Sequence, residues 1–118
     1  MKLKRVLDLL EAETIIKNFQ NLEIKTACGA DLMSDVLAFS HEKTMLLTGL
    51  TNPQVVRTAE MTDIEVICFV RGKRPTDDTI ELAAEKNISL FCTTKPLFES
   101  CGLLFENGIK AEKMHQFE

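Results

Sequence analysis

Eight residues in three short stretches have the types and spacing that bind small anions. Each stretch follows an apolar run and carries hydroxyl, amide or guanidinium side chains, with glycine in two of the three. The residues are Thr48, Gly49, Asn52, Arg71, Gly72, Arg74, Thr93 and Thr94. Hydroxyls, guanidinium groups and the amides at helix N-termini are common ligands of phosphate and carboxylate groups. The stretches predict an anion site if the fold brings them together.

The same residue types have a second interpretation. Threonine, asparagine and glycine are also typical of helix caps and turns, and arginines at such corners are often solvated. Asn52 followed by Pro53 is the order expected at the start of a helix, because proline lacks an amide proton that would be unpaired there. A chain without any ligand would carry these residues too, so both interpretations stay open.

The sequence lacks the motifs of common nucleotide enzymes. A phosphate-binding P-loop needs a glycine five residues before its Gly-Lys pair and a hydroxyl residue after it. Gly72-Lys73 has Ile67 and Arg74 at those positions. No segment has the three glycines of a dinucleotide-binding turn. We therefore expect no nucleotide-dependent catalysis of these kinds.

The sequence also shows no recognisable set of catalytic or metal-binding residues. His41 lies in a polar stretch and His115 near the C-terminus, with no serine or cysteine at a recognisable catalytic spacing. Asp77 and Asp78 follow Thr76 and suit the first turn of a helix, where the dipole favours negative charge. We predict no catalytic residue, no metal ligand and no cofactor.

Composition narrows the class of protein. The chain has 118 residues, enough for one domain, and a formal net charge of -4 that is spread along the sequence. It has no basic run that would attract a nucleic acid and no apolar stretch of the roughly 20 residues that span a membrane. Its four cysteines match neither a redox pair nor a zinc motif. We expect a cytoplasmic protein with reduced, packed thiols and no nucleic-acid or membrane partner.

The elements that must position the eight residues follow a repeating pattern. An apolar run, a polar corner and an amphipathic helical pattern recur between residues 25 and 108. Alternation of this kind predicts an α/β fold with a mostly parallel central sheet flanked by helices. The clearest strands are residues 45–47, 64–70 and 90–92. In such sheets ligands bind at the carboxyl ends of the strands, where the polar corners would lie.

The remaining elements are predicted from shorter patterns. Residues 3–11 form an amphipathic helix, residues 14–16 an edge strand that needs covering or pairing, and residues 24–28 another short strand. Asp31, Asn52, Thr76 and Thr94 are predicted helix caps. The helix after Asp31 should reach about Phe39 and turn Leu32, Val36, Leu37 and Phe39 to the sheet. Residues 109–118 are expected to fray.

Residues 29–38, 46–50, 70–75 and 90–94, together with Phe98, resemble the DRTGG domain. The resemblance covers roughly residues 24–108 and extends to the non-catalytic N-terminal domain of HPr kinase/phosphorylase. It implies a single three-layer domain over residues 1–118, a homodimer, and no catalytic activity of its own. Stand-alone copies are similar to small proteins encoded beside redox and hydrogenase genes, which implies a regulatory or assembly role with an unknown protein partner.

Two functions of different classes follow. The first is a non-enzymatic regulatory or ligand-sensing module that binds a nucleotide or another phosphorylated small molecule at the strand ends. The second is a protein-interaction or assembly module without a small-molecule ligand, for which an apolar surface patch would be the sign. An enzyme is a third class, but it needs an acid and base pair that the sequence does not show.

Overall fold

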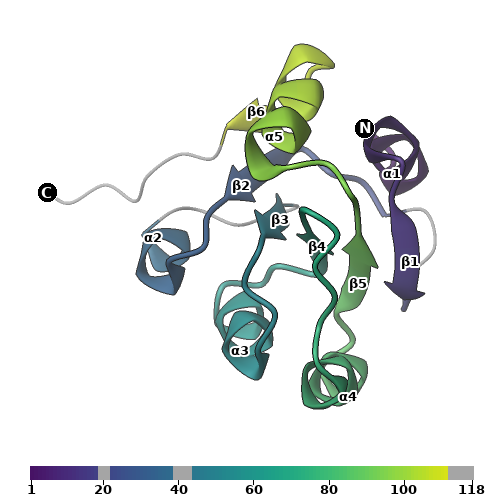
Figure 1. The fold of residues 1–118 in the computed structure, drawn as a ribbon. Helices are drawn as coiled ribbons and strands as arrows, with labels where there is room; N and C mark the ends of the chain where they lie inside the picture. Colours follow the sequence, from purple (N-terminus) through teal and green to yellow (C-terminus); the bar gives the residue numbers. More distant parts are fainter. Residues whose placement is uncertain (19–21, 39–43, 112–118) are drawn as a thin grey trace, which may run out of the picture.

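A six-stranded sheet forms the centre of the molecule, in the order β1-β5-β4-β3-β2-β6 (Figure 1). The computed structural model describes residues 1–18, 22–38 and 44–111. The strands are β1 (Glu13–Ile16), β2 (Thr26–Gly29), β3 (Thr44–Thr48), β4 (Val66–Phe69), β5 (Ser89–Cys92) and β6 (Lys110–Ala111). β1 is antiparallel to β5, and every other neighbouring pair is parallel. The predicted α/β fold with a mostly parallel sheet is confirmed.

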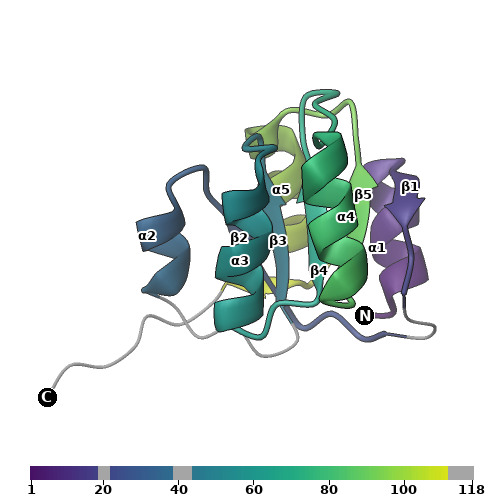
Figure 2. The ribbon, with the colours of Figure 1, turned by 90° about the horizontal axis from the view of Figure 1, so that it is seen from below.

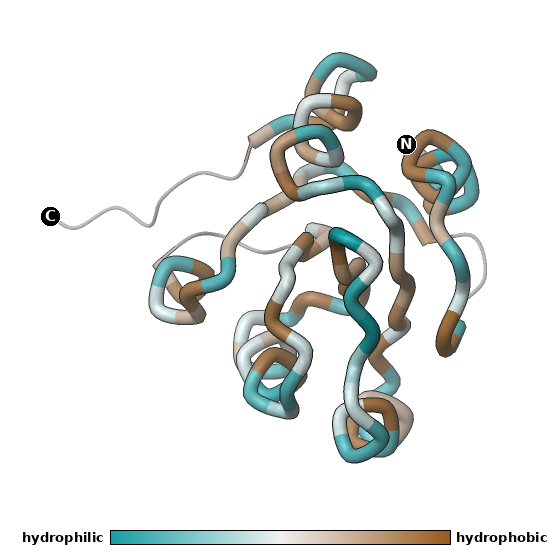
Figure 3. The backbone as a smooth tube through the Cα atoms, in the orientation of Figure 1, coloured by the Kyte–Doolittle hydropathy of each residue, from teal (hydrophilic) through white to brown (hydrophobic). Residues whose placement is uncertain are grey.

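Helices cover both faces of this sheet and complete three layers (Figure 2). On one face lie α1 (Leu3–Leu10) and α5 (Leu97–Glu106), and on the other lie α2 (Met33–Leu37), α3 (Pro53–Met61) and α4 (Asp77–Glu85). Hydrophilic residues occupy the outward turns of α3 and α4 (Figure 3). None of the helices in the described residues is long and apolar enough to cross a membrane.

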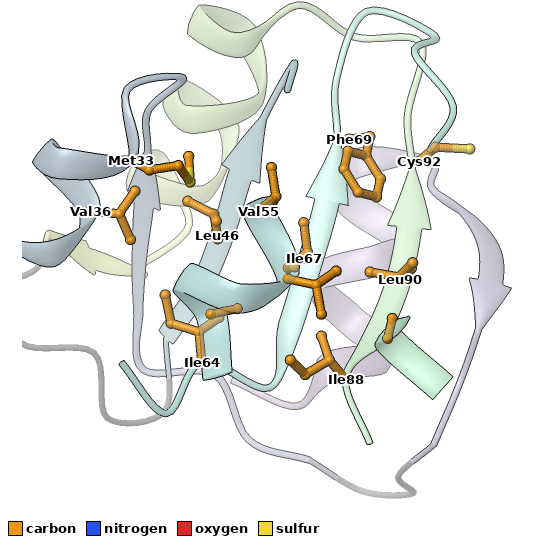
Figure 4. Packing of buried hydrophobic residues seen from close by; sticks show 13 residues of the cluster. Met33, Val36, Leu46, Val55, Ile64, Ile67, Phe69, Ile88, Leu90 and Cys92 are labelled. Carbon is orange, nitrogen blue, oxygen red and sulfur yellow. The ribbon is translucent and has the colours of Figure 1, made fainter. Parts of the chain in front are cut away.

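The central strands are apolar without interruption because both of their faces are buried. Leu46 and Ile67 pack into the cluster under α2, α3 and α4 (Figure 4), whereas their neighbours Met45 and Cys68 pack into the cluster under α1 and α5. Alternate side chains of a strand point to opposite faces, so a strand between two helical layers needs apolar residues at every position. This packing explains why the sequence pattern identified these strands.

The start of α2 differs from the sequence prediction. The helix begins at Met33 and its N-cap position is Leu32, which makes no side-chain capping bond. Asp31 therefore does not cap it. Leu32 and Leu37 are 62% and 42% exposed, whereas Met33 and Val36 are buried. The predicted inner face was wrong at Leu32 and Leu37, because the shorter helix starts later and turns a different stripe to the sheet. Phe39, also placed on that face, lies outside the described residues.

The predictions for the other helix caps were right in part. Asn52 caps α3 as predicted, since its side chain accepts a hydrogen bond from the Gln54 amide. Pro96, not Thr94, holds the N-cap position of α5. Thr76 stands at the N-cap of α4, but its hydroxyl contacts the side chains of Asp78 and Thr79 instead of a backbone amide.

The segment after Gly108 is ordered further than expected. Ile109 is buried, and β6 pairs with β2 in parallel register. Fraying from residue 109 was therefore a wrong prediction for residues 109–111, because burial of Ile109 and the pairing with β2 hold them. Residues 112–118 lie outside the described part of the chain.

Gly29 is required where β2 meets α5. A Cβ added there would lie 2.5 Å from Sγ of Cys101 and 3.2 Å from Cδ1 of Leu97. We expect Gly29→Ala to lower the free energy of unfolding by about 1–3 kcal/mol, because the strand and the helix must move apart. Chemical denaturation measures this loss.

Gly102 supplies the matched control. A Cβ there would meet nothing within 4 Å, and the residue lies inside α5. Gly102→Ala should therefore stabilise the chain, by up to about 1 kcal/mol from helix propensity. Adding Cys101→Ala to Gly29→Ala removes the clashing sulfur and should restore part of the loss. Equal stability of the two glycine variants would contradict the close approach at Gly29.

Candidate functional site

The corners that follow β3, β4 and β5 meet at one end of the sheet. The three strands are adjacent and parallel, and Phe69 pairs with Thr48 on one side and Cys92 on the other. Figure 2 shows the connections after these strands together at one edge of the molecule. The sequence expectation that the three corners converge is confirmed. Whether they bind a ligand depends on what their polar groups already contact.

At the β3 corner, Asp31 occupies the polar groups that an anion would use. The Thr48 hydroxyl donates to Oδ1 of Asp31 at 3.0 Å, and the Gly49 amide donates to the same oxygen at 2.7 Å. The Leu50 amide donates to the Thr48 hydroxyl at 3.1 Å. Asp31 was missed as a site residue, because an aspartate before a helical pattern is usually its cap. Its carboxylate instead links the end of β2 to the end of β3.

The β4 corner is a tight turn with two left-handed residues. Arg71 and Gly72 have φ angles of 58° and 69°, and the Lys73 amide donates to the Val70 carbonyl at 3.1 Å. Positive φ at both central residues is typical of a type I′ turn. Arginine adopts this conformation less readily than glycine. The turn therefore fixes the backbone of Arg71 at the exposed carboxyl end of β4.

The β4 turn is bound to the β5 corner through its backbone. The Arg71 amide donates to the Lys95 carbonyl at 2.9 Å, and the Gly72 amide donates to the Thr93 carbonyl at 2.8 Å. These two amides are therefore not available to a ligand. Gly72 allows the turn to form, and only the side chain of Arg71 remains to contact a ligand.

The two arginines of the predicted site diverge. Nη2 of Arg71 lies 3.4 Å from the position of a Cβ at Gly49, beside the Asp31 carboxylate. Arg74 turns the other way, with Nη1 3.3 Å from Oε2 of Glu13 and 3.5 Å from Sγ of Cys92. The structure thus groups Arg71 with the β3 corner and places Arg74 over β1 and β5. Sequence patterns could not separate them, because the partner of Arg74 lies 61 positions away.

At the β5 corner, the two threonines differ in burial. Thr93 is 3% exposed, and its hydroxyl donates to the Leu10 carbonyl at 2.6 Å while it accepts from the Lys95 amide at 3.2 Å. Thr94 is exposed. The Thr93 hydroxyl therefore joins the end of α1 to the corner, whereas the Thr94 hydroxyl lies at the surface, as does Asn52 at the start of α3.

Ion pairs surround the β5 corner. Nζ of Lys95 lies 3.2 Å from Oε2 of Glu11 and 3.5 Å from Oε2 of Glu99. The hydrogen bond with Glu11 is the main cause that raises the pKa of Lys95. Lys95 thus holds α1 and α5 together at the surface. Its charge is already paired, so it is a weaker candidate for an incoming anion than Arg71, which has no ion pair among the described residues.

The thiols near the site are protonated packing groups. Burial raises the pKa of Cys92, and the nearby Arg74 charge opposes that rise only in part. Burial raises the pKa of Cys68 to about 12. A thiol must lose its proton to act as a nucleophile or a metal ligand. Neither cysteine is therefore poised for covalent chemistry.

Metal binding has no support in the part of the chain that the structure describes. No group of three or more histidine, cysteine, aspartate or glutamate residues lies close enough there to hold an ion. His41 and His115 lie outside the described residues.

Comparisons with known proteins find a structural neighbour. No protein-family model matches the chain, and no curated protein matches it. Among solved structures it is similar to the CBS and DRTGG domains of the regulatory region of Clostridium perfringens pyrophosphatase, complexed with the activator diadenosine tetraphosphate. The TM-score is 0.75 and the identity 19%, over 94% of this chain and 50% of that chain. The chain thus spans about half of that structure and shares the fold of the matched part, which confirms the predicted resemblance to the DRTGG domain.

Proposed function

We propose that this chain is a non-catalytic regulatory module that binds an anionic small molecule, a nucleotide or another phosphorylated metabolite, at the carboxyl ends of β3, β4 and β5. The observation that carries the proposal is the position of Arg71, fixed by its turn beside Gly49 and without an ion pair among the described residues. A solved structure with the same fold belongs to a regulatory region in complex with a nucleotide activator, which supports the same class of function.

Within the eight candidate residues, the contacts suggest different roles. Arg71, Asn52 and Thr94 have exposed side chains and would meet the ligand directly. The hydroxyls of Thr48 and Thr93 are engaged in the fold, so these two residues would support the corners. Gly49 would allow the ligand to approach the backbone, Gly72 would shape the turn, and Arg74 would remain with Glu13.

The Asp31 carboxylate would compete with an anionic ligand for the proposed site. Its carboxylate accepts hydrogen bonds from Thr48 and Gly49, and it lies beside Arg71. A phosphate at this corner would meet a like charge at short range, which disfavours binding. The ligand must therefore displace the Asp31 carboxylate or approach Arg71 from its far side.

Thermal-shift measurements on the purified chain test the proposal. The probes are nucleotides, dinucleotides such as diadenosine tetraphosphate, and small phosphorylated metabolites. A ligand at about ten times its Kd adds roughly 1.4 kcal/mol of stability, which raises the Tm of a domain this size by about 4–8 °C. Arg71→Gln should abolish the shift, because it removes the guanidinium charge. Asp31→Asn keeps an acceptor oxygen, removes the competing charge and should lower the Kd.

Arg74→Gln is the matched control. It removes the same charge three residues further along the chain, from a side chain already paired with Glu13. It should leave the ligand-induced shift in place. The proposal fails if none of the probes raises the Tm. The assignment to Arg71 fails if a shift persists in Arg71→Gln and disappears in Arg74→Gln.

A second candidate function is a protein-interaction module. Phe98 and Phe105 are exposed on α5, far above the exposure usual for large apolar side chains. A chain that binds only proteins would show no thermal shift with any probe, yet would still use this helix.

A further inference from the structure

Asp31 and Arg71 both reach the surface of Gly49 at the β3 corner. The position that a Cβ would take at Gly49 lies 3.4 Å from Nη2 of Arg71, and 3.6 and 3.7 Å from Oδ1 and Oδ2 of Asp31. The two side chains nevertheless form no ion pair with each other. A guanidinium donor and a carboxylate acceptor therefore lie beside the same glycine with a gap between them.

Backbone hydrogen bonds hold both groups at this corner. The amide of Ala30, which precedes Asp31, donates to the Leu47 carbonyl at 3.1 Å and continues the pairing of β2 with β3. The Val70 amide donates to the Thr48 carbonyl at 3.0 Å, directly before the β4 turn. The aspartate and the arginine are therefore both carried by backbone that is hydrogen-bonded to β3.

One carboxylate oxygen of Asp31 is available to a ligand. Oδ1 accepts from the Thr48 hydroxyl and the Gly49 amide, whereas Oδ2 accepts no hydrogen bond from the described residues. The guanidinium of Arg71 likewise donates to none of them. Both side chains are exposed. A ligand group that donates to Oδ2 and accepts from Nη2 would satisfy both at once.

A hydroxyl is the group that suits this gap. A phosphate placed there would be repelled by the Asp31 carboxylate, and an ammonium would be repelled by the Arg71 guanidinium. A hydroxyl is neutral, and it both donates and accepts a hydrogen bond. Nucleotides and sugar phosphates carry such hydroxyls close to their phosphates. In dinucleotide-binding sheets, an acidic side chain accepts a hydrogen bond from a ribose hydroxyl by the same chemistry.

We propose that Asp31 selects ligands that carry a ribose, by accepting a hydrogen bond from a ribose hydroxyl that lies over Gly49 and accepts from Arg71. This inference rests on the proposed function, because Arg71 would also bind the phosphate through its remaining N–H groups. The phosphate then lies on the side of Arg71 that faces away from Asp31. An anionic ligand can thus bind at a corner that contains a carboxylate, since its sugar meets Asp31 and its phosphate does not.

Matched pairs of ligands test this selection. Isothermal titration calorimetry on the full chain compares AMP, GMP, CMP and UMP, each with its 2′,3′-dideoxy counterpart. Loss of a hydrogen bond to a charged group should raise the Kd of the dideoxy form by about tenfold to a hundredfold. Ribose 5-phosphate identifies the source of the sugar. If it binds as tightly as a nucleotide, a sugar phosphate is sufficient, and if it binds more weakly, the base contributes too; both results support the proposal.

Asp31→Asn tests the acceptor. The variant keeps one oxygen for the Thr48 hydroxyl and the Gly49 amide, but its other terminal atom is an amide donor that cannot accept from a hydroxyl. Removal of the charge also favours the phosphate of either ligand. The Kd of the dideoxy form should therefore approach that of the ribose form, and the preference for ribose should be lost.

Gly49→Ala tests the position of the hydroxyl. Its methyl group would stand between Nη2 of Arg71 and the Asp31 carboxylate, in ordinary contact with both, and Gly49 has no left-handed φ angle that would strain an alanine. The variant should keep the stability of the wild-type chain and lose the preference for ribose. Gly102→Ala is the matched control, because its Cβ would meet nothing within 4 Å, and it should keep the preference.

The possible failures are distinguishable. Equal Kd values for each ribose and dideoxy pair in the wild-type chain overturn the selection by Asp31 and leave the proposed function in place. A preference for ribose that persists in both Asp31→Asn and Gly49→Ala also overturns it, because the hydroxyl would then bind elsewhere. If no phosphorylated probe of any kind binds, the proposed function fails and this inference fails with it.

Discussion

Phe91→Ala is expected to lower the free energy of unfolding by about 3–5 kcal/mol. Phe91 is fully buried in β5 and packs with residues of α1 and α5, among them Val6 and Leu104. Deleting the ring leaves a cavity between the sheet and these helices. Domains of this size are typically stable by about 5–15 kcal/mol, so the loss takes a large share of the total.

Phe98→Ala is the control for this prediction. It deletes the same ring from a position that is 91% exposed, where a substitution normally changes stability by less than about 0.5 kcal/mol. Both variants are compared with the wild-type chain by urea denaturation, at a concentration where sedimentation shows monomers. Similar losses for the two variants would mean that Phe91 does not lie between the sheet and the helices.

Thr93→Val is expected to cost about 1–3 kcal/mol for each polar group that it leaves unsatisfied. Valine keeps the shape of threonine but cannot donate to the Leu10 carbonyl or accept from the Lys95 amide. Both partners sit at the junction of α1, β5 and α5, and Thr93 is buried there. The loss therefore measures how strongly this hydroxyl ties the three elements together.

Thr94→Val tests the neighbouring position. Its side chain is exposed, so the free energy of unfolding should change by less than about 0.5 kcal/mol. If Thr94 contacts the proposed ligand, this variant loses part of the ligand-induced thermal shift while its own stability is unchanged. Equal destabilisation by Thr93→Val and Thr94→Val would contradict the different roles assigned to the two hydroxyls.

The sequence predicted that the polar corners lie together at the strand ends. It predicted only in part which of their side chains remain available to a ligand. The strand ends were identified because polar corners follow strongly apolar runs, and parallel strands bring such corners to one edge. Which polar groups stay available depends on contacts between distant segments. The separation of Arg71 from Arg74 and the engagement of Thr48 with Asp31 are contacts of that kind.

The order of helices and strands from α1 to α5 could be predicted from the sequence, because the patterns that indicate it are local. Apolar runs marked β3, β4 and β5, and Asn52-Pro53 marked the start of α3. Which side chains contact one another depends on the packing of segments that are distant in the sequence. Thr93 reaches a carbonyl 83 positions away, and β6 pairs with a strand more than eighty residues earlier in the chain. Such contacts depend on how the layers pack, so no periodicity within a segment can indicate them.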